Sequence, residues 1–313
     1  MINKSNQFLL ILSPFFLIVG PALINFSLSI VSILTLIIFY REKKFTILKN
    51  YIVILFLIWC AYLILNSLFS NYPYLSLEGS LFYFRYGILV LAISYYFIFN
   101  KTEFIKYFFI SISICFLLLF VDSIYQLLFN KNILGYSNDD LRITSFFMDE
   151  NILGSYLSRT LPLFIALYFI LFKSMNKYLE LTLMTIILLT IFMVFISGER
   201  TAFFINIVSL FLIMILTKNK FNYKFIFFAL ILISIFIVNY FKPQVKHRMI
   251  TTTIDQLQLY KSEGNILNSI PKIFTVQHEV IFKTAYKIYL DNKIFGIGPK
   301  NFREECIHYR TFT

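Results

Sequence analysis

Charged residues are scarce in this sequence. They make up 14% of its 313 residues, whereas a typical water-soluble domain carries about 25%. The three cysteines have no metal-ligand spacing, and the sequence contains neither a P-loop nor the glycine fingerprint of a dinucleotide-binding fold. These absences exclude a water-soluble globular domain, a cysteine-based metal site and the common nucleotide-binding classes. We therefore expect no cofactor and no metal ion.

Apolar residues are abundant instead, at 59% of the chain. They occur in repeated runs of about 17–25 residues, the length that crosses a bilayer as a helix. The predicted fold class is an all-α polytopic membrane protein of about nine transmembrane helices, with the first long run divided in two at Gly20-Pro21. The predicted spans are about 8–19, 22–40, 51–69, 81–99, 104–129, 151–172, 178–196, 201–217 and 222–241.

These spans form a predicted transmembrane domain over residues 1–241, followed by a large extracytoplasmic loop over residues 242–313. Apolar residues keep recurring in this loop, which favours amphipathic helices at Met249–Tyr260 and Val276–Leu290. One interpretation is a lid over a site in the membrane, because long loops usually have a role. The other is a surface loop with interfacial helices.

The net charge of +12 does not indicate nucleic-acid binding, because the basic residues lie mostly between apolar runs, where they act as orientation signals. Basic loops alternate along the chain with loops poor in Lys and Arg. The positive-inside rule then places the N-terminus in the cytoplasm. The outer side receives residues 70–80, 130–150, the turn Ser197–Arg200 and residues 242–313. In a bacterium we expect a multi-pass protein of the inner (plasma) membrane with residues 242–313 in the periplasm.

The ionisable residues well inside the predicted spans lie on one side of the membrane, and the inner half has only Lys106, Glu180 and Lys224 at span edges. Arg85, Asp122 and Arg159 all fall in the outer half of their spans, and the outer loops and turns add Arg142, Glu150, Glu199 and Arg200. Charges at this depth are costly and are usually paired or functional. The pattern predicts an arginine-rich cavity open to the exterior. Structural ion pairs, such as Asp122 with Arg85 or Arg159, are the alternative.

The turn Ser197-Gly198-Glu199-Arg200 joins two predicted spans with very few residues. A tight turn needs only Ser and Gly, so its two charges have another reason to be there. Arg200 lies beside the N-terminus of the next helix, where free N–H groups and the helix dipole favour an anion such as a phosphate or pyrophosphate. The alternative is an interfacial arginine that anchors the helix end.

Three stretches of the sequence carry a resemblance to a known family. Residues 142–159 form an Arg-led loop that runs into a span, Ser197–Arg200 is a Ser-x-x-Arg turn before an apolar helix, and Asp291–Phe302 contains Gly296-Ile297-Gly298-Pro299. In order, spacing and membrane placement they resemble the O-antigen ligase and O-antigen polymerase-like family of bacterial envelope glycosyltransferases. The resemblance covers about residues 140–305.

The resemblance implies transfer of a glycan from an undecaprenyl-pyrophosphate-linked donor to lipid A-core or to another glycan unit, without a metal ion. The expected partners are that donor, that acceptor and the lipid bilayer. The predicted catalytic residues are Arg142, Arg200 and His278, and the predicted substrate-binding residues are Arg159, Glu150, Glu199, Arg85 and Asp122. Arginine forks stabilise charge on a departing pyrophosphate, and a histidine is the usual base near neutral pH.

The sequence departs from the family in its last part. The resemblance implies a motif of the form His-Pro-His-Asn and further spans after the large loop, but the sequence stops at Thr313 before that point. His278 does not match that motif. We therefore expect a fragment or a truncated product, and the lone Cys306 in an oxidising compartment also suggests a missing partner.

Two other function classes stay open. A transporter or flippase of a lipid-linked or anionic substrate would favour ionisable residues near the midplane and inverted repeats, whereas the charges here lie on one side. A non-catalytic membrane protein, inactive through truncation, is the third hypothesis.

Overall fold

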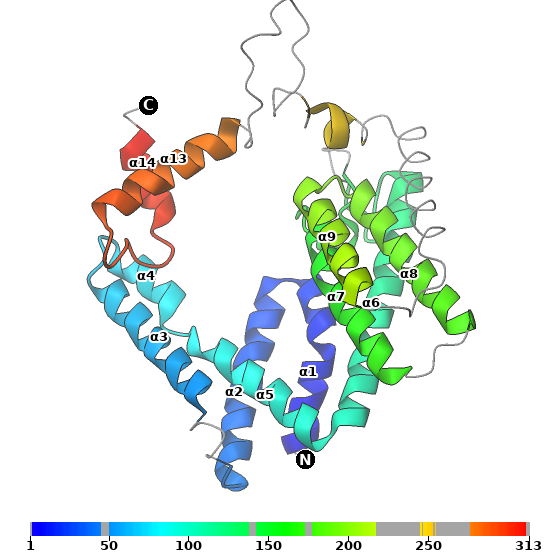
Figure 1. Ribbon diagram of the computed structural model, residues 1–313, viewed down its shortest axis with the longest axis horizontal. Helices are drawn as coiled ribbons and strands as arrows, with labels where there is room; N and C mark the ends of the chain where they lie inside the picture. Colours follow the sequence, from blue (N-terminus) through cyan, green and yellow to red (C-terminus); the bar gives the residue numbers. More distant parts are fainter. Residues whose placement is uncertain are drawn as a thin grey trace, which may run out of the picture. The chain divides into compact units, whose positions relative to one another are not determined.

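The computed structural model describes residues 2–44, 50–137, 142–172, 177–216, 245, 247–252, 254 and 276–310. Within these ranges the chain forms helices, turns and loops and no strand (Figure 1). Seven of the helices are long and apolar enough to cross a membrane. The chain is therefore a multi-pass helical membrane protein, as predicted.

The chain divides into two compact units, and each is described by itself. Unit 1 comprises Met1–Gln7, Phe26–Ile98 and Ile254–Thr313. Unit 2 comprises Phe8–Asn25 and Phe99–Thr253. The two first helices, α1 (Ile2–Val19) and α2 (Pro21–Arg41), each contribute to both units.

Most of α2 packs in unit 1 with α5 (Phe84–Phe99), and the two helices run in the same direction. A guanidinium nitrogen of Arg85, near the start of α5, donates to Ser29 at 3.3 Å. The Tyr95 hydroxyl, three turns further along α5, donates to Glu42 just past the end of α2, at 2.9 Å. The start of α1 joins the same end of the unit, because the side-chain amide of Asn3 donates to Glu42 at 3.0 Å.

The helix α3 (Tyr51–Leu68) runs antiparallel to α4 (Pro73–Ser80) and α5. The hydroxyls of Ser67 and Ser80 lie 2.8 Å apart at one end of this pair, and the rings of Phe56 and Tyr83 stack at 6.1 Å further along. Pro73 occupies the first turn of α4, where its missing N–H costs nothing. The α3–α4 corner therefore lies at one end of the unit.

The helices α13 (Val276–Asp291) and α14 (Phe302–Arg310) are anchored to that corner. The side-chain amide of Asn71 donates to Glu305 at 2.6 Å, and the Tyr72 hydroxyl lies 3.1 Å from His308 Nε2. The two helices are tied to each other by the Tyr309 hydroxyl, which donates to Asp291 at 2.6 Å. That hydrogen bond raises the pKa of Tyr309.

Unit 2 is built on α6 (Lys101–Phe129), with α7 (Leu153–Leu171), α8 (Lys177–Ile196) and α9 (Arg200–Leu216) packed around it or one another. The ring of Phe109 on α6 stacks on Phe164 of α7 at 4.9 Å, and both rings pack near Tyr168. The Tyr168 hydroxyl donates to the Leu179 carbonyl at 2.8 Å and so joins the end of α7 to the start of α8. Consecutive helices of the unit thus alternate in direction.

The part of α1 in unit 2 contains Pro14, which cannot donate to the carbonyl of Leu10. The Ser13 hydroxyl donates to that carbonyl at 2.7 Å instead. The carbonyl of Pro14 accepts from the Tyr156 hydroxyl of α7 at 3.1 Å. Backbone groups in a membrane need such partners, because no water replaces them.

The predicted span boundaries agree with the helices to within a few residues, with two differences. The first helix begins at Ile2 rather than at residue 8, because polar residues of its first turns find partners: the Asn6 amide donates to Thr35 at 3.0 Å. The predicted span 81–99 begins earlier, at Pro73, and its helix is interrupted by a turn between α4 and α5.

The predicted number of nine spans is not reached in the described part of the chain. Seven helices meet the length and hydropathy of a span, and α9 is apolar but shorter. The predicted span 222–241 lies outside the described residues, as does most of the predicted helix Met249–Tyr260. The predicted helix Val276–Leu290 is present as α13.

Candidate functional site

Asp122 organises the loop between α6 and α7. It lies two turns before the end of α6 and is fully buried. One carboxylate oxygen accepts from the backbone N–H of Ile133 and the other from the Ser145 hydroxyl, each at 2.7 Å. Both of its oxygens thus hold the loop, and a contact of Asp122 with substrate stays a prediction.

Gln126, one helical turn after Asp122, continues this buried polar network. Its side-chain oxygen accepts from the backbone N–H groups of Thr144 and Ser145 at 3.0 and 2.8 Å. The carbonyl of Ser145 accepts from the side-chain amide of Asn132 at 2.9 Å. Ser145 thus has its N–H, carbonyl and hydroxyl all engaged.

These bonds hold Ser145 in an unusual backbone conformation. Its φ is 53°, and Met148 has a φ of 55°. Non-glycine residues rarely adopt positive φ, and such strain persists only where surrounding contacts determine it. Strained residues of this kind gather at binding sites. The loop that carries Arg142 is therefore held in one costly shape by the side chains of α6.

Glu199 joins the turn between α8 and α9 to the N-terminus of α7. Its carboxylate accepts from the backbone N–H of Gly154 at 2.6 Å, and from the N–H and hydroxyl of Ser155 at 3.0 and 2.6 Å. A carboxylate at a helix N-terminus satisfies free N–H groups and the helix dipole. The predicted roles of Glu199, contact with substrate and orientation of the arginines, stay predictions.

Two glycines make this contact possible. Gly198 has a φ of +71°, the left-handed conformation that lets α8 turn into α9 within a few residues. A side chain at Gly154 would place its Cβ 2.6 Å from the Ser197 hydroxyl and 3.0 Å from Glu199 Oε1. The N-termini of α7 and α9 therefore meet closely at one end of unit 2.

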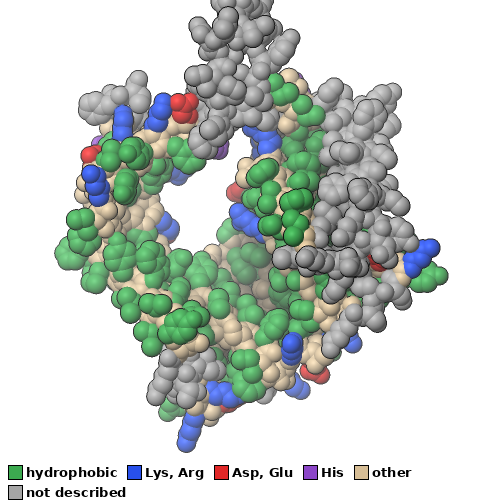
Figure 2. Space-filling model, in the orientation of Figure 1, with side chains coloured by type: hydrophobic (Ala, Val, Ile, Leu, Met, Phe, Trp, Pro, Cys, Tyr) green, Lys and Arg blue, Asp and Glu red, His purple; other side chains and the backbone are tan. Residues whose placement is uncertain are grey.

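The arginines Arg142, Arg159 and Arg200, which we call the arginine corner, all lie on the segments that these bonds hold. Arg142 is half-buried three residues before Ser145, and Arg200 is half-buried at the first position of α9. Arg159 is exposed on α7, six residues or about 9 Å along the axis from its start. Glu150 is exposed in the loop before α7. Lys and Arg side chains gather along one edge of this unit in the space-filling view (Figure 2).

Arg142 carries a buried donor. Within the described residues its Nε is buried and has no hydrogen-bond partner. A buried donor left unpaired costs about 1–3 kcal/mol. The guanidinium is thus held where an acceptor from a bound molecule would satisfy it.

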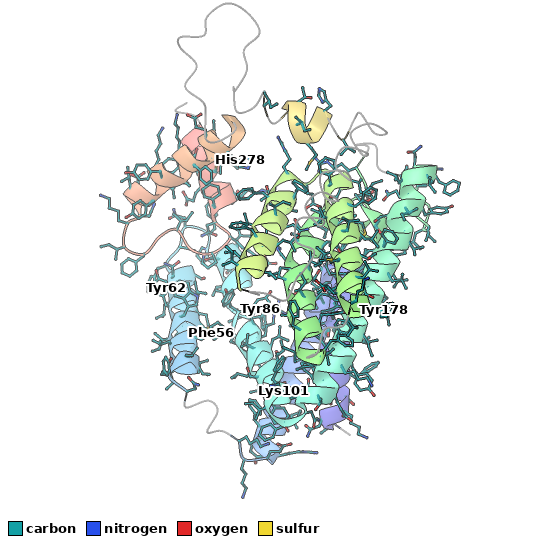
Figure 3. All side chains as sticks on the ribbon, turned by 45° about the vertical axis from the view of Figure 1, so that its right-hand side comes forward. Phe56, Tyr62, Tyr86, Lys101, Tyr178 and His278 are labelled. Carbon is teal, nitrogen blue, oxygen red and sulfur yellow. The ribbon has the colours of Figure 1, made fainter. Side chains whose placement is uncertain are left out.

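Two of the predicted site residues belong to unit 1. Arg85 lies near the start of α5, where one of its nitrogens donates to Ser29. His278 is exposed on α13, with its ring 6.5 Å from that of Phe282 (Figure 3). Since the arginine corner belongs to unit 2, the pairing of Arg85 with Asp122 and a role for His278 beside the arginines stay predictions.

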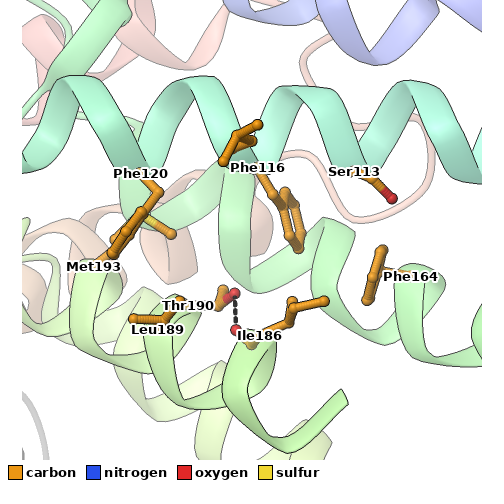
Figure 4. A pocket seen from close by; sticks show the side chains of 9 residues that line it. Ser113, Phe116, Phe120, Phe164, Ile186, Leu189, Thr190 and Met193 are labelled. Atoms are coloured by element: carbon orange, nitrogen blue, oxygen red, sulfur yellow. Dashed lines mark hydrogen bonds between the residues drawn. The ribbon is translucent and has the colours of Figure 1, made fainter. Parts of the chain in front are cut away.

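An apolar cavity of about 290 Å³ lies between α6, α7 and α8 (Figure 4). Its lining includes the aromatic rings of Phe116, Phe120 and Phe164 and the thioether of Met193. Its two hydroxyls are used on their own helices: Ser113 donates to Phe109 and Thr190 to Ile186, each at 2.8 Å. The cavity therefore offers hydrocarbon contacts, and it suits an acyl or polyprenyl chain.

Sequence reasoning missed Gln126 and Ser145. The signal was present: Asp122 and Gln126 are spaced by four residues, so they share one face of a helix that is otherwise apolar. Two polar side chains on one face of a span indicate a buried network. No group of three His, Cys, Asp or Glu side chains that could hold a metal ion occurs in the ranges that the structure covers.

Comparisons with known proteins add no relative. No family model matches the chain, and no match is found among curated proteins or among solved structures.

Proposed function

We propose that this chain is a membrane glycosyltransferase that transfers a glycan from an undecaprenyl-pyrophosphate-linked donor to lipid A-core or to another glycan unit. The observation that carries the proposal is the half-buried Arg142, whose Nε lacks a partner in the described residues, on a strained loop that leads into the N-terminus of α7. Arginines and helix N-termini both favour a phosphate or pyrophosphate.

The chemistry assigns distinct roles to these residues. An acceptor hydroxyl attacks the anomeric carbon of the donor sugar, the bond from that carbon to the pyrophosphate oxygen breaks, and undecaprenyl pyrophosphate leaves. Arg142 and Arg200 stabilise the charge that develops on the leaving group through paired N–H donors, and Arg159 contacts the donor further along α7. Glu199 is a positioning residue. The acceptor hydroxyl gives its proton to a base; His278, predicted for that role, belongs to unit 1, so its part stays a prediction.

The apolar cavity supports a lipid-linked donor. Met193 lies at its lining, three residues before the end of α8 at Ile196, and Arg200 begins α9 after a short turn. Phe120, also at its lining, is two residues from Asp122. A molecule with a pyrophosphate at the arginine corner would thus have hydrocarbon contacts close by in the same unit.

The test replaces the arginine fork but keeps its charge. Arg142→Lys and Arg200→Lys are compared with Arg303→Lys, an exposed arginine of α14. Lysine keeps the charge but cannot make the planar paired contact, so we expect glycan transfer to fall about 10²-fold at the first two positions and to stay unchanged at the third. Transfer is measured from a lipid-linked donor in membranes of a strain without its own enzyme, with protein levels matched. Full activity of both variants would refute the pyrophosphate role, and donor movement across the bilayer without transfer would favour a flippase.

The proposed location is a bacterial inner membrane with the N-terminus in the cytoplasm. In unit 1, Glu42 and Lys44 lie at one end, and the α3–α4 corner with α14 at the other. In a Cys306→Ser background, Tyr74→Cys, at a side chain that is 92% exposed, should react with an impermeant thiol reagent in intact cells, whereas Lys44→Cys should not. The reverse pattern would invert the orientation.

A further inference from the structure

A groove in unit 1 lies between α3 and the turn that joins α13 to α14, with a volume of about 380 Å³. The helix α3 contributes Trp59, Tyr62, Leu63 and Asn66. These residues are spaced by three and four along the chain, so they share one face of the helix. Tyr83 and Phe295 complete an aromatic lining. In Figure 3 the labelled Tyr62 lies on α3 just below that turn.

The lining changes in character along α3. Trp59 lies nine residues, or about 13 Å, before the end of the helix at Leu68, near the middle of a span. Asn66 lies two residues before that end, next to the backbone of the turn. A groove that is aromatic and apolar at mid-span and polar at the span's end matches the polarity of a single membrane lipid, from chain to head group.

Hydrogen bonds between α3 and the turn hold the two sides of the groove together. The Tyr62 hydroxyl donates to the Phe295 carbonyl at 3.1 Å, and the Asn66 amide donates to the same carbonyl. Gly298, at a φ of +87°, lets the turn seat itself closely: a Cβ there would come within 2.7 Å of the Ser76 hydroxyl. These contacts fix the turn against α3 and α4.

The polar end of the groove carries one charge of each sign. Lys300 Nζ lies 3.3 Å from Glu78 Oε2, and their side chains are 47% and 69% exposed. Lys300 directly follows Pro299, and Glu78 directly precedes Gly79. Pro299 and Gly79 both line the groove. The space-filling view shows hydrophobic side chains over the α3 region and charged ones above them towards α13 and α14 (Figure 2).

We propose that this groove binds one phospholipid with a zwitterionic, hydrogen-bonding head group, of the phosphatidylethanolamine type. Its acyl chain lies along Trp59 and Leu63, its phosphate meets Lys300, and its ammonium meets Glu78. A purely anionic head group would meet the like charge of Glu78. A choline head group lacks N–H donors for that carboxylate. This site is independent of the proposed glycan transfer.

The chain contains a single tryptophan, Trp59, so its fluorescence reports on this groove. The test places the 313-residue chain in phosphatidylcholine nanodiscs that contain the same small fraction of brominated phosphatidylethanolamine, phosphatidylcholine or phosphatidylglycerol. Bromine in the acyl chain quenches tryptophan on contact. We expect phosphatidylethanolamine to occupy the groove roughly threefold more than the other two, the size expected for one set of exposed charges.

Three variants separate the head-group contacts from general effects. Glu78→Gln and Lys300→Gln should each remove the preference, while the emission maximum of Trp59 in pure phosphatidylcholine stays unchanged and so shows an intact groove. Lys293→Gln, at an exposed lysine of the same turn, should keep the preference.

Four results would overturn the proposal. Equal quenching by all three lipids would mean ordinary bilayer contact, and no quenching would mean that protein covers Trp59. Stronger quenching by phosphatidylcholine would mean that the aromatic rings hold a quaternary ammonium. A preference for phosphatidylglycerol that depends on Lys300 alone would mean an anion site.

Discussion

The two units use polar side chains in opposite ways. In unit 2 two carboxylates join separate segments: Asp122 is fully buried and Glu199 is half-buried, and each accepts hydrogen bonds from backbone N–H groups of a neighbouring loop or helix. In unit 1 the segment from α13 to α14 is held to the α3–α4 corner by pairs of mixed burial, such as the exposed Glu78 with Lys300 and the part-buried Asn71 with Glu305.

This difference has a physical consequence. Hydrogen bonds from backbone N–H groups to a buried carboxylate are strong because no water competes for them. Loss of the carboxylate leaves the N–H donors unsatisfied. An exposed pair contributes at most about 1 kcal/mol. The segments that carry the arginine corner of unit 2 are therefore held by bonds that are costly to break, whereas the exposed Glu78–Lys300 pair adds little to the attachment of the α13–α14 segment in unit 1.

The largest effect is expected from Asp122→Ala. The substitution leaves the Ile133 N–H and the Ser145 hydroxyl without their acceptor, so we expect unfolding to become easier by about 3 kcal/mol. The measurement is unfolding of the purified protein in detergent micelles. The matched control is Ser123→Ala on the same helix: its hydroxyl is buried with no partner in the described residues, so its removal should be nearly neutral or stabilising. Equal losses at both positions would contradict the assigned role of Asp122.

Glu199→Ala comes next. It removes three hydrogen bonds at the start of α7, and we expect a loss of about 2 kcal/mol. Hydrogen exchange should rise first at residues 153–157. Glu150→Ala, at an exposed carboxylate of the loop before α7, serves as the control and should change exchange little. Unchanged protection at α7 in Glu199→Ala would show that other contacts hold this helix end.

The sequence predicts the positions of the helices better than it predicts the contacts of their polar side chains. Helix positions were predictable because bilayer thickness fixes the length of an apolar run, and Gly20-Pro21 and Ser197–Arg200 mark their turns. Arg85, Asp122 and Arg159 stood out in the sequence because charge is costly in hydrocarbon. What each charge contacts was not predictable: the partner of Asp122 is Ser145, across a loop whose path no local pattern determines.

The helix α4 and the α3 groove were missed for a related reason. Residues 70–80 read as a polar loop, yet Ser67, Ser76 and Ser80 bond one another and bury their hydroxyls. Their partners include the turn around Gly298, more than 200 residues away along the chain. Contacts this distant depend on tertiary packing, which periodicity does not record.

A smaller effect is expected from Glu305→Ala, which tests the attachment of α14. The side chain is 8% exposed and accepts from Asn71 at 2.6 Å. A charge-assisted bond of this kind contributes about 1–2 kcal/mol, so hydrogen exchange of residues 302–310 should become faster while α7 in unit 2 is unaffected. The neighbouring Glu304→Ala is the control for helix propensity and net charge. Faster exchange in both variants to the same extent would mean that Asn71 does not anchor the segment.

The smallest effect is expected at the other end of unit 1 and depends on pH. The hydrogen bond from Lys44 at 2.7 Å, followed by that from Asn3, lowers the pKa of Glu42 from its ordinary value of 4.5. Because the folded state lowers this pKa, the stabilisation is complete above 4.5 and is lost as the pH falls through the folded-state pKa. The difference in unfolding free energy between the wild type and Glu42→Gln should thus be below about 1 kcal/mol at neutral pH and shrink in acid. In a Lys44→Gln background the pH-dependent part should be smaller, since the main cause of the shift is gone. A difference that stays constant from neutral to acid pH would show that Glu42 contributes through packing and not through its charge.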